Sequence, residues 1–322
     1  MRELKIGKNE NDQRLDRFIK KYLEKAPAGF IYKMIRKKNI ELNRKRAKPD
    51  TMIYEGDKVQ LFLAEDTIKK FEAEKEEITT DKRLNIIYED DNIVLINKES
   101  GMLSHGRGGE FEENVVDSLI SYLIKTGDYV PRVEKTFTPS ICNRLDRNTS
   151  GLMVGAKNYK SLKIINDAFK RMDIKKFYKT IVEGELQKEK REKAYIVKDE
   201  EKNRVSIASK GEEESKRIVT GIRSLKVKNG YSLVEVELVT GRTHQIRIHL
   251  SSLGYPIIGD RKYGDKKVNN QFKKEYNINN QILHSYKLEF GGLEDGLEYL
   301  NGKVFKAPFT KEFLEVEEDL FK

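Results

Sequence analysis

The sequence predicts an α+β fold with a mixed, largely antiparallel sheet. Beyond the first quarter of the chain, short runs rich in isoleucine, leucine and valine at 86–88, 93–96 and 231–239 are typical of strands. Stretches at 113–124 and 158–172 lie between them and predict amphipathic helices. Strands and helices do not alternate strictly, and no glycine-rich nucleotide-binding turn follows a strand. A parallel nucleotide-binding sheet is therefore not expected.

Length and composition favour a soluble chain of two domains. The chain has 322 residues, of which 36% are charged and 37% hydrophobic. It contains no run of about 18 apolar residues and does not start with a signal peptide, so we expect a cytoplasmic protein and no membrane partner. The single cysteine, Cys142, has no disulfide partner and belongs to no cluster at metal-ligand spacing, so no metal is expected.

Positive charge is concentrated at the start of the chain. The formal net charge is +10, and residues 1–64 hold 17 lysines and arginines against 9 aspartates and glutamates. Lysine and arginine that neutralise phosphates release condensed counterions, which drives binding without reading sequence. This asymmetry indicates a nucleic-acid surface, and the alternative is a solvated basic face without a partner.

The pattern of this first domain predicts two short packed helices followed by strands. Apolar residues recur at helical spacing over 15–22 and again over 30–35, with a break at Pro27 between them. A basic turn at 44–46 and a closing strand near 56–62 follow. The layout resembles the small α-L RNA-binding domain shared with ribosomal small-subunit protein four. The resemblance implies that RNA is bound by the basic residues Arg36, Lys37, Lys38, Arg44, Lys45 and Arg46.

A linker is expected between this domain and the rest of the chain. Residues 65–80 mix glutamate, lysine and threonine with few large apolar groups, so they bury too little surface to offset the entropy of ordering. Residues 81–322 would then form the second, catalytic domain.

A charged motif near the middle of the chain is the strongest candidate for a reactive site. Residues 142–151 read Cys-Asn-Arg-Leu-Asp-Arg-Asn-Thr-Ser-Gly. In this run Asp146 stands between Arg144 and Arg147 and precedes small turn-forming residues, an arrangement that can hold a charged oxygen at the mouth of a cleft. Taken alone, such a cluster is more often a set of surface ion pairs.

The motif resembles the signature of the large-subunit ribosomal pseudouridine synthase family, His-Arg-Leu-Asp-x-x-Thr-Ser-Gly. Asn143 stands at the usual histidine, and its amide keeps a donor and an acceptor that can brace the loop. Glu99 stands at a usual proline. Further segments match the family in the same order, at 97–106, 175–184, 241–250, 259–264 and 283–285.

The resemblance implies a role for each candidate residue. Asp146 would be the catalytic carboxylate, and Arg247 would pair with it and favour its ionised form. Tyr178 would pack against the target base, and Leu283 would form an apolar wall beside it. Arg144 would enter the space that the extruded base leaves.

Local patterns add expectations for the elements that carry these residues. Tyr178 and Val182 should share one face of a strand, with Ile181 on the other. Thr243 should cap a helix that runs to Gly254. The histidines in these segments are expected to form structural hydrogen bonds and to bind no metal; they are His244, His249 and His284.

The implied reaction is the isomerisation of uridine in RNA to pseudouridine, after the base is flipped out at a cost of about a few kcal/mol. The reaction needs no net redox change or energy input, so no cofactor is expected. The aspartate could attack covalently or remove a sugar proton, and the sequence leaves both routes open. The expected partner is RNA, in the first place 23S-type ribosomal RNA or a ribosomal precursor particle. Alternatives are a synthase acting on transfer RNA, a non-catalytic RNA-binding or assembly factor, and a nucleoside hydrolase or glycosylase.

Overall fold

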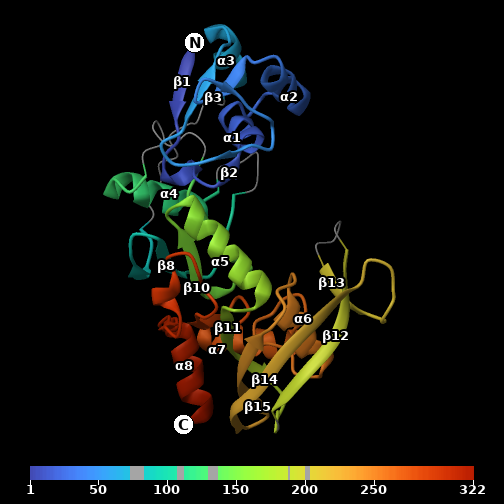
Figure 1. The fold of residues 1–322 in the computed structure, drawn as a ribbon. Helices are drawn as coiled ribbons and strands as arrows, with labels where there is room; N and C mark the ends of the chain where they lie inside the picture. The colour runs from blue at the N-terminus through green and yellow to red at the C-terminus, as the bar shows by residue number, and fades with distance from the viewer. Residues whose placement is uncertain (73–82, 107–111, 130–136, 188, 200–203) are drawn as a thin grey trace.

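The computed structural model describes residues 1–72, 83–106, 112–129, 137–187, 189–199 and 204–322. Figure 1 shows the N-terminal elements, in blue, gathered at one end, and the C-terminal helix α8, Lys311–Phe321, ending at the other. Within the described residues, no helix combines the length and apolar character needed to cross a bilayer.

The N-terminal elements surround a core of their own. Helices α1 and α2 confirm the two predicted helices, and their buried faces include Phe18, Ile19 and Ile35. A four-stranded sheet in the order β1-β6-β3-β4 packs on them, and β2 pairs with β5. The elements are β1 Arg2–Lys5, β2 Gln13–Arg14, α1 Leu15–Tyr22, α2 Ala28–Arg36, β3 Ile40–Leu42, β4 Lys45–Arg46, β5 Met52–Ile53 and β6 Lys58–Leu61.

Helix α3, Glu65–Phe71, corrects the expected start of the linker. Ile68 is fully buried in the N-terminal core, and the ring of Phe71 lies 4.8 Å from that of Phe30. Two apolar residues three apart suffice here because the existing core provides the surface that they bury. The part of the predicted linker at 73–80 lies outside the described residues.

The described residues from 83 onward form a mixed, mostly antiparallel sheet with helices packed on it, which confirms the predicted α+β class. The main strand order is β13-β12-β14-β15-β11-β16-β10-β8-β7, while β17 pairs with β16 and β9 with β10. The strands are β7 Ile86–Glu89, β8 Ile93–Lys98, β9 Ser140–Ile141, β10 Ser150–Ala156, β11 Lys175–Glu183, β12 Lys190–Asp199, β13 Arg204–Ala208, β14 Lys216–Lys228, β15 Tyr231–Leu238, β16 Leu283–Glu289 and β17 Val304–Lys306.

Helices α4 and α5 confirm the two predicted helical stretches. Each begins at an asparagine cap, with Asn114 accepting from the backbone of Asp117 and Asn158 from that of Ser161. Glycine at 127, in the left-handed conformation, ends α4. Helices α6 and α7 lie between β15 and β16 along the chain. The bounds are α4 Val115–Thr126, α5 Tyr159–Arg171, α6 Gln245–Ser252 and α7 Lys266–Tyr276.

The strands carry side chains into cores on both faces of the sheet. On β11, Tyr178 and Val182 enter the core shared with α4, whereas Ile181 enters the core shared with α7 and α8, as the alternation predicted. The pairing of β10 with β16 departs from the antiparallel pattern, since these two strands run parallel, with Gly151 beside Ser285. This seam joins the two parts of the sheet that hold the candidate site.

Candidate active site

Asp146 lies in the loop between β9 and β10, and a buried side chain of a neighbouring segment donates hydrogen bonds to this loop region. Lys98 is almost fully buried, and its ammonium donates to the carbonyls of Glu99, Met102 and Arg147 at 2.8, 2.9 and 2.8 Å. All three of its protons are thereby used within the loop region. The loop backbone beside Asp146 is consequently fixed to β8.

Asn143 braces the same loop from its other side. Its amide oxygen accepts from the backbone N–H of Val154 at 2.8 Å, and its amide nitrogen donates to the carbonyl of Leu152 at 3.3 Å. Asparagine at the usual histidine position therefore supplies both a donor and an acceptor to β10, as predicted from its amide.

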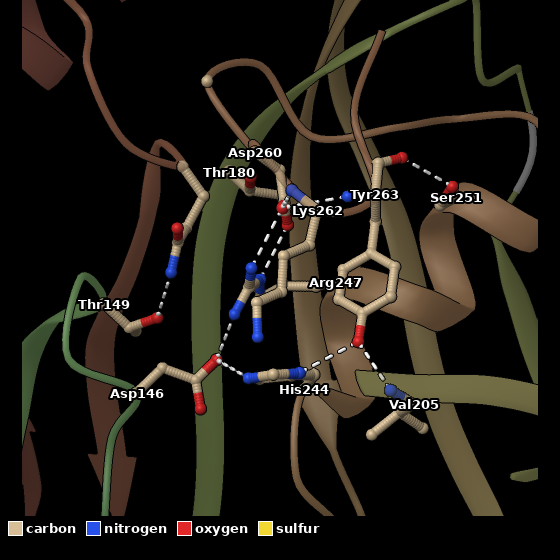
Figure 2. Close-up of polar contacts among 12 residues, drawn as sticks. Asp146, Thr149, Thr180, Val205, His244, Arg247, Ser251, Asp260, Lys262 and Tyr263 are labelled. Atoms are coloured by element: carbon tan, nitrogen blue, oxygen red, sulfur yellow. Dashed lines mark hydrogen bonds and ion pairs between the residues drawn. The ribbon is translucent and has the colours of Figure 1, made fainter. Parts of the chain in front are cut away.

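Arg247 lies on α6, and its side chain points at Asp146 (Figure 2). Its Nη1 lies 2.9 Å from Asp146 Oδ2. Its Nε and Nη2 donate to the two carboxylate oxygens of Asp260 at 2.6 and 2.9 Å, and Asp260 is completely buried. Such a two-bonded fork fixes the guanidinium plane. Burial opposes the charge of Arg247, but Asp260 and Asp146 outweigh that effect and raise its pKa.

His244 approaches the same oxygen of Asp146. Its Nε2 lies 4.0 Å from Asp146 Oδ2, and its Nδ1 lies 2.9 Å from the hydroxyl of Tyr263. Burial lowers the pKa of His244, and the positive charges of Arg247 and Lys262 act in the same direction against Asp146. The ring is therefore neutral at neutral pH.

The start of α6 corrects the predicted cap. The N-cap is His244, with φ +52°, and its side chain caps no helix N–H. The amide oxygen of Gln245 instead accepts from the N–H of Arg242 at 3.2 Å and from the hydroxyl of Thr240 at 2.9 Å. This local bonding holds the turn without Thr243. The left-handed residue turns the His244 ring toward Asp146.

The five residues implied for the catalytic domain meet around one open pocket. Asp146 and Arg247 form its charged wall, and Leu283 and Tyr178 are buried in its apolar wall. Burial raises the pKa of Tyr178, and the charge of Asp146 adds to the shift, so its phenol keeps its proton. Arg144 is exposed and also lines the pocket.

The six basic residues implied for RNA binding lie elsewhere, exposed on the N-terminal domain. Two of them, Arg36 and Arg46, line a groove there together with Tyr32, Lys33 and Lys48. The other four, Lys37, Lys38, Arg44 and Lys45, stand on the surface at the end of α2 and at the β3–β4 turn.

Sequence reasoning missed Asp260 and the buried role of Lys98. Both stand in segments that matched the family, but nothing local says that Asp260 faces Arg247, since 13 residues and the end of a helix separate them. For Lys98, the missing signal is its burial, because lysine is rarely enclosed.

His249 and His284 bond to hydroxyl groups. Nδ1 of His249 lies 2.8 Å from Thr220 Oγ1, and Nδ1 of His284 lies 2.8 Å from Ser150 Oγ. Among the residues that the structure describes, no group of three histidine, cysteine or acidic side chains is placed to hold a metal ion.

Comparisons with known proteins identify the family of the chain. Residues 92–252 match the family model described as RNA pseudouridylate synthase. An uncharacterized RNA pseudouridine synthase of Mycoplasma capricolum is 32% identical over 93% of this chain and 95% of its own. The ribosomal large subunit pseudouridine synthase C of Buchnera aphidicola is 32% identical over 89% of this chain and 88% of its own.

A solved structure shares the fold. Human RNA pseudouridylate synthase domain containing 4 superposes with a TM-score of 0.56 at 22% identity, covering 72% of this chain and 91% of that one. Together with the relatives' identity over almost their full length, the family match settles the class of protein. This chain belongs to the RNA pseudouridylate synthase family, enzymes that isomerise uridine in RNA to pseudouridine.

Proposed function

We propose that this enzyme modifies uridines of large-subunit ribosomal RNA and that Asp146 is its catalytic residue. The relatives named for the large ribosomal subunit support that RNA as the substrate. The observation that carries the assignment of Asp146 is its position at the pocket, 2.9 Å from a buried arginine that Asp260 holds in place. A cytoplasmic location follows from the proposed substrate.

The geometry gives the two oxygens of Asp146 different surroundings. Arg247 and His244 both approach Oδ2, which leaves Oδ1 for the substrate (Figure 2). An ionised carboxylate so held can attack the nucleotide or remove a sugar proton. In either route the bond from C1′ to N1 breaks, a bond from C1′ to C5 forms, C5 loses its proton and N1 gains one.

The walls of the pocket suit an extruded pyrimidine. Tyr178 offers a protonated phenol ring and Leu283 an apolar side chain, both buried beside Asp146. Arg144 stands exposed at the pocket, where a cation can enter the gap in the RNA stack. Flipping costs about a few kcal/mol, and contacts of this kind offset it.

The decisive variant is Asp146→Asn, assayed on transcribed 23S-type ribosomal RNA by carbodiimide labelling of pseudouridine. We expect activity to fall by on the order of 10³-fold or more, with RNA affinity unchanged, because the substitution removes the reacting charge and little volume. Asp91→Asn, at an exposed site, is the matched control. Product formation by Asp146→Asn at the wild-type rate would refute the assignment.

The same assay separates the alternatives. Release of free uracil would indicate a glycosylase, and binding without any product would indicate an assembly factor. Faster turnover of transfer RNA than of ribosomal RNA would overturn the substrate proposal.

For the N-terminal domain we propose a tethering role in RNA binding. Its groove is lined by Arg36 and Arg46 and by the exposed ring of Tyr32, a combination of cations and an aromatic that suits an RNA backbone and its bases. Replacing Arg36 and Arg46 by glutamine should weaken RNA binding and reduce the slope of log affinity against log salt by about 0.7–0.9 for each lost phosphate contact. Exposed Lys5 and Lys69, changed to glutamine together, form the control pair. An unchanged slope in the groove variant would exclude the tethering role.

A further inference from the structure

We propose that His244 is a positioning residue for Asp146, and that Tyr263 and the backbone of Val205 fix its tautomer so that Nε2–H points at Asp146. This inference rests on the proposed role of Asp146. It adds a chain of contacts that starts at the edge strand β13 and ends at the reacting carboxylate (Figure 2).

The atoms fix the direction of the first hydrogen bond, and we infer the direction of the second from it. The N–H of Val205 donates to the hydroxyl of Tyr263 at 2.9 Å, because a backbone nitrogen can only donate. The phenol proton then has Nδ1 of His244, at 2.9 Å, as its acceptor. A neutral imidazole that accepts at Nδ1 carries its proton on Nε2.

The proton on Nε2 is directed at Asp146. The 4.0 Å between Nε2 and Asp146 Oδ2 is longer than a hydrogen bond, so in the free enzyme the ring contributes an oriented dipole. Catalytic contacts of this kind tighten when substrate fills the site. With the opposite tautomer, a lone pair would face the carboxylate and repel it.

The electrostatic surroundings keep the ring neutral, as this arrangement requires. Burial and the charges of Arg247 and Lys262 lower the pKa of His244, and they outweigh Asp146 and Asp260, which act in the other direction. At neutral pH the ring therefore carries one proton, and Tyr263 decides which nitrogen holds it.

Tyr263 is well placed to act on both neighbours of Asp146. Its ring meets that of His244 edge-on at 5.6 Å, and the guanidinium of Arg247 lies 5.3 Å from the centre of its face. The hydroxyl of Ser251 also donates to its carbonyl at 2.8 Å. The ring contacts with His244 and Arg247 and the hydrogen bond from Ser251 to the backbone thus fix the position of the phenol oxygen.

The backbone of His244 carries strain that this role explains. Its φ of +52° lies in the left-handed region, which costs a side chain other than glycine about 1 kcal/mol. Strain of this kind persists at sites where geometry matters more than stability. Here it aims the ring at Asp146 from the first position before α6.

The chain of contacts ties β13 to the chemistry although no residue of β13 lines the pocket. This strand ends the main sheet and, within the described residues, pairs with β12 alone. Besides the bond from Val205, the guanidinium of Arg204 donates to the carbonyl of Lys262 at 3.2 Å. A shift of β13 would move the phenol that sets the tautomer.

The direct test is the protonation pattern of the histidine rings by ¹⁵N NMR, which is tractable because the chain has 4 histidines. In the full-length protein at pH 7.5 we expect the His244 proton on Nε2. In Tyr263→Phe, which keeps the ring but removes the hydroxyl, we expect a mixture of tautomers. A proton on Nδ1 in the wild type overturns the proposal whatever the variants do.

The kinetic test uses the same variant. Tyr263→Phe should lower kcat by about 10- to 100-fold, the usual effect of losing an orienting partner, with KM for RNA unchanged. His244→Asn keeps a residue that tolerates the left-handed backbone but does not reach Asp146, and it should lower kcat equally. The double variant should lose no more than either alone, since both act through one contact. Tyr276→Phe, which removes a phenol bonded to Asp319 on the surface, is the control.

Two outcomes separate this inference from the assignment of Asp146. If Asp146→Asn stays active, the proposed catalytic residue is wrong, while the tautomer of His244 stands or falls by its own spectrum. If Asp146→Asn is inactive but Tyr263→Phe turns over at the wild-type rate with mixed tautomers, the positioning role is refuted and Asp146 is retained.

Discussion

Gly151 shows how one small residue fixes the geometry beside Asp146. It has φ +112°, and a methyl group added to its Cα would lie 2.2 Å from the carbonyl oxygen of Ser285. The close approach is what brings β10 and β16 together as a parallel pair, five residues after Asp146. The glycine in the Thr-Ser-Gly run is therefore required by packing as well as by conformation.

Gly151→Ala should destabilise the protein by about 3 kcal/mol or more, since it combines a backbone clash with a strained φ. Gly127→Ala is the matched control, because Gly127 has φ +83° but nothing within 4 Å of an added methyl group, and it should cost about 1 kcal/mol. Urea unfolding measures both. Equal losses in the two variants would show that contact with Ser285 is unimportant.

For single residues, the sequence motifs predicted those that line the pocket. They did not predict most of the side chains that hold these residues in place. Asp146, Arg247 and Tyr178 could be predicted as pocket residues because each stands in a segment with a recognisable sequence pattern. His244 escaped notice as a helix cap since Thr243 beside it is the better capping residue by type. The pairing of Asp260 with Arg247 depends on tertiary placement, which no local pattern encodes.

Among the helices and strands, α3 likewise depends on tertiary contacts that its own sequence pattern does not encode. Its sequence is rich in charge, and on composition alone it belongs to a linker. It is a helix because Ile68 and Phe71 find an apolar surface on the N-terminal core, and because Arg2 forms ion pairs with Glu65 and Glu72 near its ends. The helices at α4 and α5 were predictable, since their own amphipathic pattern specifies them.

Ile68→Ala should weaken the N-terminal domain by about 2–4 kcal/mol, as expected for truncating a fully buried isoleucine. Hydrogen exchange on the full chain should speed up within residues 1–72 and stay unchanged in the large sheet. Lys69→Ala, on the exposed side of the helix, should leave exchange as it is. Unaltered protection in Ile68→Ala would mean that α3 adds nothing to this core.

Acid sensitivity is expected of the molecule as a whole, with His284 as a main cause. Burial lowers the pKa of His284 to about 4, from an ordinary value of 6.5, so the folded state keeps the ring neutral where the unfolded chain takes up a proton. The stability contributed by the neutral ring is present above pH 6.5 and is lost progressively as pH falls to about 4. A shift of this size corresponds to about 3 kcal/mol.

The check is urea unfolding of the wild type and of His284→Gln between pH 7.5 and pH 4. The variant should show a shallower decline across that window, whatever its stability at pH 7.5. A parallel decline in both proteins would assign the acid loss to other groups.

The parallel seam was the part of the architecture that the sequence could not reveal. An antiparallel neighbour is often signalled by a short turn, whereas Ser150 and His284 pair across more than a hundred residues. The class of fold was readable from short runs, but the order of strands depends on such distant contacts.

That order has a consequence for biosynthesis. Strand β16 follows β10 and β11 along the chain but lies between them in the sheet, so it closes a gap between two parts of the sheet that leave the ribosome earlier. Asp146 stands with one part and Arg247 with the other. A nascent chain that still lacks β16 cannot unite them, and the enzyme gains its activity only after residues 283–289 have left the ribosome.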